Sequence, residues 1–374
     1  MNTQSITFKK DEVVVLLGAG ASVDAGVPHS ADMVKQIEKA LSGDWKEFKD
    51  LYNYVRSAIF YADGIQGSFD SAVGYNIERL VVALDELSRR EEHPIYPFIG
   101  AWNPRLTQVA GENFAKVTTF KTKILEKLRH EWIEIMNYDR AGYLRGLINL
   151  QKELNYPLRV FTLNYDLCVE KTYQCEYSEF PERGFDKARL WNHELLEEVP
   201  SGQKNMLLYK LHGSIDWTRD PSTSRLTYSD STSKIRVEDG LLIFGTTYKL
   251  QYVDPFLFLV YQLRRISLDA KLLLVIGYGF GDEHINGILA QALRADSSRV
   301  KRLVAVTVCE EGNEQKLRKF IAERLGTEDS DPRLVINSCG AKPFLETGLN
   351  LMKLSRHFPP EEPIFEEVRG GAGD

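Results

Sequence analysis

The sequence has few cysteines and no cysteine pair of the kind that binds zinc. Its 374 residues include four cysteines, and no two of them form a C-x-x-C motif. Structural zinc sites and disulfide frameworks both depend on recurring cysteine pairs, so the pattern indicates neither. We expect buried or inert thiols and no bound metal. The cysteines are Cys168, Cys175, Cys309 and Cys339.

Long apolar runs are also absent. A membrane-spanning helix needs about 18–20 apolar residues, whereas the longest candidate, LLLVIGYGF, has the length of a strand. The first ten residues are polar and lack the apolar segment of a secretion signal. We therefore expect a cytoplasmic protein with no membrane partner.

Basic residues are not in excess, because the formal net charge is −6. This balance argues against a broad nucleic-acid surface, although a local basic groove and direct nucleic-acid binding stay open. The hydrophobic fraction of 43% and the charged fraction of 27% are ordinary for a globular protein. Disordered and fibrous classes are thereby excluded.

The chain contains a glycine-rich turn in the stretch VVVLLGAGASVDAGVP, residues 13–28. Five consecutive apolar residues predict a strand that is buried on both faces. Gly18 and Gly20, on either side of Ala19, would let a ligand approach the backbone, and a helix beginning at Ser22 would direct its free N–H groups to the same place. The turn is a candidate phosphate-binding site, although a tight strand-to-helix connection has the same pattern.

Helical periodicity dominates the next part of the chain. A first helix is predicted within 22–41, with Ser30 or Asp32 able to restart it after Pro28. From residue 44 to about 154, apolar residues recur at spacings of three and four, which indicates amphipathic helices. This block is too long for a simple crossover between two strands. We interpret it as a helical insertion, with a proline-broken loop at 94–104.

Apolar strands return after the insertion and alternate with helical stretches. This alternation predicts an α/β fold, a doubly wound Rossmann-like parallel sheet with helices on both faces. Residues 218–238 are rich in Ser, Thr and Asp and indicate an exposed β-hairpin or loop. Strands are predicted within 9–17, 158–166, 205–217, 271–285, 302–308 and 333–338. The predicted domains are a sheet domain (9–43 and 155–345), the helical insertion (44–154) and a C-terminal helix with an acidic tail (346–374).

Four strand ends carry residues suited to ligand binding or catalysis. The first is the GAGAS turn; Asn164 and Asp166 follow the second strand, His212 and Gly213 the third, and GYGFGD, residues 277–282, the fourth. The carboxyl ends of parallel strands meet at one edge of a sheet, where ligands bind. Singly, each has a structural alternative: helix caps for Asn164 and Asp166, a core histidine, and another tight turn.

In this order the four motifs resemble the sirtuin-like family, whose glycine-rich turn, Asn-x-Asp motif and His-Gly motif build a pocket for NAD. The resemblance runs from about residue 13 to residue 280. Two further stretches, NIERL at 76–80 and IFGTTYK at 243–249, are similar to features of the bacterial branch of that family. The resemblance implies a Rossmann-like fold with NAD as ligand.

Two departures distinguish this chain from the protein deacylases of the family. It lacks the four cysteines of their zinc module, and His29-Ser30-Ala31 follows Gly26-Val27-Pro28 where deacylases continue with Asp-Phe-Arg. With its helical insertion, the chain resembles the zinc-less prokaryotic sirtuin-like proteins of antiphage defence, which destroy NAD. The resemblance implies an NAD+ hydrolase that forms ADP-ribose and nicotinamide as a toxic effector. A non-catalytic NAD- or ADP-ribose-binding regulatory module and a zinc-independent deacylase are the alternatives.

Each site residue has a role that fits this chemistry. Asn164 would position ribose hydroxyls or a water as a bidentate group, Asp166 would stabilise the nicotinamide amide or the developing positive charge, and His212 would act as general base. The turn at 18–22 would hold the pyrophosphate, and the turn at 277–280 would lie against the adenosine half. The expected cofactor-binding residues are Gly18, Ala19, Gly20, Ser22, Gly213, Gly277, Gly279 and Phe280.

An unregulated NAD hydrolase would be toxic, yet the chain has no second recognisable sensor domain. We therefore expect that a partner protein, or assembly of the protein itself, senses the signal that activates the enzyme. Standalone sirtuin-like proteins of this size resemble those paired with a HerA-type hexameric ATPase, which we favour, or with a short Argonaute, and we expect a homo-oligomer. The sequence leaves open which trigger activates the protein and how many copies assemble. It also leaves open whether the product is hydrolysed or cyclised, whether NAD or NADP is preferred, and whether the protein has any nuclease activity.

Overall fold

The computed structural model describes residues 8–65, 75–92, 104–197, 206–220, 222–236, 240–242, 254–295 and 301–358. Several sequence predictions lie outside these ranges. They are the loop at 94–104 except for Pro104, the IFGTTYK stretch at 243–249 and the acidic tail after residue 358.

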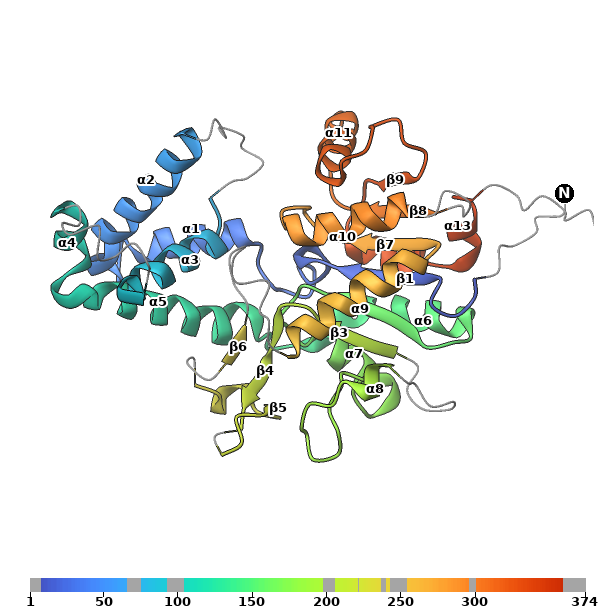
Figure 1. Ribbon diagram of the computed structural model, residues 1–374, viewed down its shortest axis with the longest axis horizontal. Coiled ribbons are helices and arrows are strands. Elements are labelled where there is room, and N and C mark those ends of the chain that lie inside the picture. The colour runs from blue at the N-terminus through green and yellow to red at the C-terminus, as the bar shows by residue number, and fades with distance from the viewer. Residues whose placement is uncertain are drawn as a thin grey trace, which may run out of the picture.

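A six-stranded parallel sheet forms the centre of the molecule (Figure 1). Its spatial order is β3-β2-β1-β7-β8-β9, so the order of the strands reverses between β1 and β7. This is the 3-2-1-4-5-6 order of a doubly wound fold, which confirms the predicted Rossmann-like α/β class. The strands are β1 Val13–Leu17, β2 Leu158–Thr162, β3 Met206–Lys210, β7 Leu272–Ile276, β8 Arg302–Val306 and β9 Leu334–Asn337.

Helices cover both faces of the sheet because its strands are apolar on both sides. Val13, Val15 and Leu17 belong to one apolar cluster, and Val14 and Leu16 belong to another. The first face is covered by α6 Arg145–Leu154, α7 Cys168–Tyr177 and the short C-terminal elements α12 Ala341–Pro343 and α13 Leu351–Ser355. The second face is covered by α9 Phe256–Asp269, α10 Glu283–Arg294 and α11 Glu314–Leu325.

A separate group of helices lies beside the sheet and has its own apolar core (Figure 1). Its core includes Met33 and Ile37 of α1, so the predicted boundary at residue 44 divides elements that share this core. A π-helical turn, Leu128–Ile133, ends the group. There Arg129 donates to the carbonyl of Ile215 at 3.0 Å and so ties the group to the strand β4 Gly213–Arg219. The helices are α1 Ser30–Ala40, α2 Lys49–Ile65, α3 Ile77–Ser88, α4 Pro104–Ala110 and α5 Ala115–Lys127.

The first predicted helix begins later than expected. Residues Ala19–Ala21 form one 3-10 turn, further turns follow, and α1 begins only at Ser30. Gly26 adopts a φ of +113°, which is incompatible with a helix, and Pro28 lacks the N–H that a continuous helix would use. The helix thus begins at Ser30, one of the two restart points predicted after Pro28, and the predicted start at Ser22 was wrong.

The predicted strand at 205–217 is two strands in two sheets. β3 ends at Lys210, and β4 Gly213–Arg219 enters a three-stranded sheet of order β5-β4-β6. Gly213 turns the chain with a φ of +89°. His212 thereby lies at the junction between the sheets, and β4 with β5 forms the hairpin that the polar segment predicted. The other strands are β5 Leu226–Tyr228 and β6 Gly240–Leu242, and the short helix α8 spans Glu194–Glu197.

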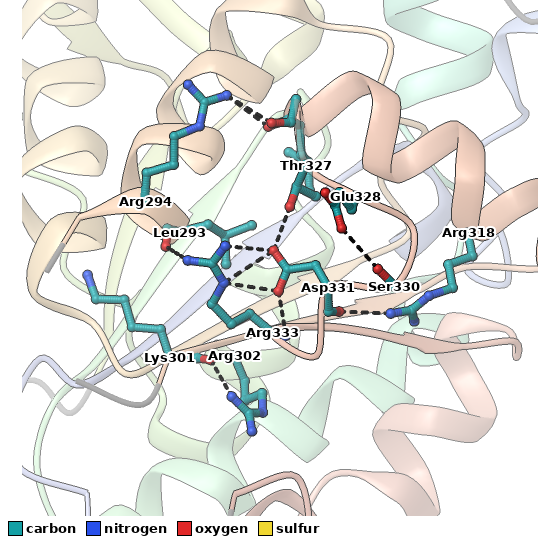
Figure 2. A network of polar contacts seen from close by, with 12 residues as sticks. Leu293, Arg294, Lys301, Arg302, Arg318, Thr327, Glu328, Ser330, Asp331 and Arg333 are labelled. Atoms are coloured by element: carbon teal, nitrogen blue, oxygen red, sulfur yellow. Dashed lines mark hydrogen bonds and ion pairs between the residues drawn. The ribbon is translucent and has the colours of Figure 1, made fainter. Parts of the chain in front are cut away.

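Basic side chains gather at the amino edge of the parallel sheet, where helices end and strands begin (Figure 2). Lys301 donates to the carbonyl of Ala292 at 3.2 Å, and Arg333 donates to that of Leu293 at 2.8 Å. Arg294 donates to the carbonyls of Leu325 and Gly326. We call this set of cations the amino-edge cluster. It satisfies carbonyl groups at the ends of α10 and α11 that no helical N–H reaches.

Candidate active site

The glycine-rich turns after β1 and β7 are packed directly against each other. Gly20 donates its N–H to the carbonyl of Gly277 at 2.8 Å. A Cβ on Gly18 would lie 2.5 Å from Cα of Tyr278, and a Cβ on Gly277 would lie 2.2 Å from the backbone nitrogen of Ala21. Gly277 also has a φ of +66°. These glycines are therefore required by backbone-to-backbone packing, a cause that the sequence interpretation, based on ligand approach, did not include.

The first turn offers a phosphate fewer free N–H groups than predicted. Gly20, Ala21 and Ser22 donate their N–H groups to the carbonyls of Gly277, Gly18 and Ala19. No helix begins at Ser22 to supply more, because α1 starts eight residues later, at Ser30. Ala19 is the exposed residue of the turn. Any pyrophosphate contact must therefore centre on Ala19 and its neighbours rather than on a helix N-terminus.

Asn164 links the end of β2 to the first glycine turn. Its side-chain nitrogen Nδ2 donates to the carbonyl of Gly18 at 2.9 Å and to Oγ of Ser22 at 3.0 Å. Both amide hydrogens are thus used within the protein. Oδ1 is the atom left to accept a hydrogen bond from a ligand hydroxyl or a water. The structure therefore supports an acceptor role for Asn164 and not the bidentate role that we expected.

Asp166 lies two residues before α7 and contacts its first residue. Its Oδ1 accepts the backbone N–H of Cys168 at 2.9 Å, and its side chain is buried. The contact is local, as the helix-cap alternative expected, but the N-cap residue of α7 is Leu167 and not Asp166. Burial, together with the charge of Asp166, raises the pKa of the Cys168 thiol, which stays protonated. Cys168 is therefore an inert core thiol, as the sequence predicted.

His212 faces the carboxylate of Asp282, the last residue of the fourth motif, to which the sequence analysis gave no role. Nε2 of His212 lies 3.3 Å from Oδ2 of Asp282, and the two side chains are only 7% and 4% exposed. Oδ1 of Asp282 accepts the backbone N–H groups of His284 and Ile285 at the start of α10. An aspartate before a helix signals a cap in the sequence, but nothing there signals that its second oxygen faces His212.

The turn after β7 is held by a buried network around Tyr278. The hydroxyl of Tyr278 accepts the N–H of Asp282 at 3.1 Å and lies 2.9 Å from Oδ1 of Asn286. Nδ2 of Asn286 donates to the carbonyl of Phe280 at 2.9 Å. Burial raises the pKa of the Tyr278 hydroxyl, so it remains a neutral donor. The turn is thus rigidly attached to α10.

Phe280 does not have the exposure that its predicted role requires. Its ring is 1% exposed and packs 4.8 Å from the ring of Tyr278, inside the apolar core of the second face. Packing of this ring on an adenine base is therefore not available in this structure. Gly279 is exposed, and a Cβ there would meet nothing within 4 Å. Gly213 is buried at the start of β4, next to His212.

Hydrogen bonds and close contacts connect all four motifs in a closed circuit at the carboxyl edge of the sheet. Asn164 contacts Gly18, and the turn of Gly18 contacts the turn of Gly277. That turn leads through Tyr278 to Asp282 and so to His212. The ring of His212 lies 6.4 Å from that of Tyr165, the residue after Asn164. We call this circuit the carboxyl-edge site, and it lies where the strand order reverses between β1 and β7.

A buried group of four charges supports the carboxyl-edge site. Nζ of Lys210 lies 2.9 Å from Glu170 and also donates to the carbonyl of Asp166. Arg183 lies 2.8 Å from Asp216. Burial acts to raise the pKa of Asp216, but the charges of Arg183 and Lys210 outweigh it and hold that pKa below its usual value. This group ties α7, β3 and β4 together around His212, and no sequence motif indicated it.

Comparisons with known proteins relate the chain to Sir2 proteins. It is similar to a family described as SIR2-like domain over residues 158–327, a little under half of its length. It is similar to the crystal structure of a Sir2 homolog–NAD complex, with 15% identity, 92% of this chain and 89% of that chain covered, and a TM-score of 0.41. It is also similar to Sir2Tm bound to a propionylated peptide, with 12% identity, 91% of each chain covered and a TM-score of 0.35. No curated protein matches the chain.

The SIR2-like match includes Asn164, Asp166, His212 and the turn after β7, and it begins after the first glycine turn. Among the described residues, no group of three or more histidine, cysteine, aspartate or glutamate side chains is arranged to hold a metal ion. No helix within the described ranges has both the length and the apolar character to cross a membrane.

Proposed function

We propose that this protein hydrolyses NAD+ to ADP-ribose and nicotinamide at the carboxyl-edge site. The observation that carries the proposal is the circuit itself, which holds Asn164 and His212 at the point where the sheet's strand order reverses. Ligands bind at such reversal points in doubly wound sheets. The SIR2-like match over residues 158–327 supports NAD as that ligand.

The residues fit a glycosidic hydrolysis. Nicotinamide is a cationic leaving group in NAD+, so the bond to the ribose breaks through an oxocarbenium-like transition state. Water then forms the new bond to the anomeric carbon, nicotinamide departs with the electron pair of the broken bond, and the proton of the water passes to His212. Asn164, which is neutral, would accept a hydrogen bond from that water or from a ribose hydroxyl without quenching the cationic centre.

We extend the proposal to an effector role in antiphage defence, in which activity depletes cellular NAD. This role, and a partnership with a HerA-type hexameric ATPase rather than a short Argonaute, rest on the resemblance of the motifs and on the helical insertion. A homo-oligomer belongs to the same proposal. Light scattering of the purified protein, alone and with each candidate partner, tests it; a stable monomer that binds neither would contradict it.

A second candidate is a non-catalytic module that binds NAD or ADP-ribose. The observation in its favour is that Asp166 and the two donors of Asn164 are used within the protein. Side chains whose hydrogen bonds stabilise the fold do not need to take part in catalysis. The two candidates differ in whether removal of His212 abolishes turnover or only alters binding.

The decisive experiment incubates the purified protein with NAD, alone and with cell extract or the candidate ATPase, and separates the products by chromatography. We expect His212→Ala and Asn164→Ala to reduce nicotinamide release by about 10²–10⁴-fold, the usual contribution of a general base or a positioned nucleophile. His130→Ala, in the helical group, is the matched control and should retain activity. Binding of NAD without turnover under every condition would favour the module instead.

A further inference from the structure

His212 and Asp282 face each other at an ion-pair distance that lacks hydrogen-bond geometry, so the position of the proton must be inferred. Nε2 and Oδ2 are 3.3 Å apart and almost fully buried, so two bare acceptors at this distance would repel each other without screening by water. The two backbone N–H groups at Oδ1 favour the ionised carboxylate. The proton therefore belongs to Nε2 of His212.

The position of Asp282 is fixed independently of His212. Its Oδ1 is held by the first turn of α10, and its backbone N–H is held by the hydroxyl of Tyr278. Asn286 joins the same network through Tyr278 and Phe280. A carboxylate held in this way directs Oδ2 to one place, so it orients the imidazole rather than following it.

The other imidazole nitrogen is left for a ligand. Within the described part of the chain, Nδ1 of His212 makes no hydrogen bond and no ion pair. A neutral imidazole with its proton on Nε2 carries its lone pair on Nδ1. We propose that Asp282 is the positioning residue of the carboxyl-edge site, which fixes His212 as the Nε2–H tautomer and makes Nδ1 the proton acceptor. The catalytic part of this inference rests on the proposed hydrolase function.

Substitution of Asp282 by asparagine separates its two contacts. A helix cap needs an oxygen to accept N–H groups, and asparagine caps as well as aspartate. With its oxygen on α10, the substituted side chain must direct its NH₂ group at His212. Nε2 must then accept, and the proton moves to Nδ1. Asp282→Asn therefore predicts the opposite tautomer in a protein of nearly unchanged stability.

The first test reads the tautomer directly and needs no enzyme activity. Histidine labelled with ¹⁵N in the full chain is observed by long-range ¹H–¹⁵N NMR at about pH 8.5, where an ordinary imidazole is neutral. His212→Ala identifies the signal among the seven histidines. We expect Nε2–H in the unmodified protein and Nδ1–H in Asp282→Asn. A proton on Nδ1 in the unmodified protein overturns the proposal, even if the variant fails to fold.

The second test measures turnover and NAD affinity. A wrong tautomer removes the base, so Asp282→Asn should lower kcat by about 10²-fold or more while KM changes less than about threefold. Asp220→Asn is the matched control, because Asp220 also accepts two backbone N–H groups, those of Ser222 and Thr223, on the β4–β5 hairpin. It should keep the full kcat. An Asp282→Asn variant with normal kcat overturns the positioning role.

The NMR test and the turnover test together distinguish a failure of this inference from a failure of the proposed function. If NMR shows the expected tautomers but His212→Ala leaves turnover unchanged, the pairing of His212 with Asp282 is upheld and the hydrolase proposal fails. If His212→Ala abolishes turnover while the unmodified protein carries its proton on Nδ1, the hydrolase proposal is upheld and the positioning role fails.

Discussion

The two edges of the parallel sheet use polar groups in opposite ways. In the amino-edge cluster, the cationic side chains donate hydrogen bonds to carbonyls or carboxylates of the protein, as Lys301, Arg294 and Arg333 do (Figure 2). In the carboxyl-edge site, among the residues that the structure describes, Oδ1 of Asn164 and Nδ1 of His212 make no contact beyond those that hold the two side chains. The first arrangement favours stability, and the second is what the proposed ligand site requires.

At the amino edge, Arg333 makes several hydrogen bonds at once to neighbouring groups of the protein. Arg333 donates to both oxygens of Asp331, with the shortest contact at 2.7 Å, and also to the carbonyl of Leu293. The hydrogen bonds from Arg333, with a further one from Thr327, hold the pKa of Asp331 well below its usual range. Both edges therefore carry charged side chains, but within the described residues the carboxyl edge also holds polar atoms that make no contact with the protein. This difference predicts where substitutions cost stability and where they cost activity.

The largest loss of stability is expected for Lys210→Met in the buried charge group. It leaves Glu170 without its nearest cation and removes the donor to the carbonyl of Asp166. Breaking a buried ion pair costs about 3–5 kcal/mol of unfolding free energy, measured by urea denaturation. Lys210→Met combined with Glu170→Leu removes both partners and should recover part of the loss. A loss below about 1 kcal/mol for the single variant would contradict this interpretation.

The next largest loss is expected for Gly277→Ala. The new Cβ would lie 2.2 Å from the nitrogen of Ala21, at a φ of +66°. Overpacking and backbone strain together should cost about 2–4 kcal/mol in urea denaturation. Gly279→Ala, two residues along the same turn, meets open space and serves as the control. Equal stability of the two variants would rule out interlocking of the glycine turns.

A smaller, pH-dependent loss is expected at the amino edge. Because the pKa of Asp331 is lowered on folding, its contribution is complete above the unfolded carboxyl pKa of about 3.9 and is lost as pH falls toward the folded value. Asp331→Asn should cost about 1 kcal/mol at neutral pH, a figure reduced for solvent screening, and should flatten the acid side of the stability profile. NAD turnover should be unchanged. An unchanged acid profile would show that Asp331 gains nothing from Arg333.

Sequence reasoning located the sheet and the edge at which the four motifs lie, because both depend on local patterns. Apolar runs followed by glycine or polar residues mark buried strands and their carboxyl ends, and the strands lie within the ranges predicted. The break at His212 was missed because apolar residues continue on both sides of it, with Leu211 before and Ile215 and Trp217 after, so the segment was taken as one strand. Asp282 was missed because its second contact joins residues 70 positions apart in the chain. The N–H groups of the first turn were misjudged because their acceptors include Gly277.

The neighbouring position of β1 and β7 also determines when the site can first exist during synthesis. β1 ends at residue 17, and its partner β7 begins at residue 272. Long-range parallel pairing of this kind forms late, because a large loop must close first. A ribosome-bound chain that has released the glycine turn, Asn164 and His212 still lacks Asp282 and the wall formed by the second turn. The carboxyl-edge site is thus assembled only when most of the protein has been made.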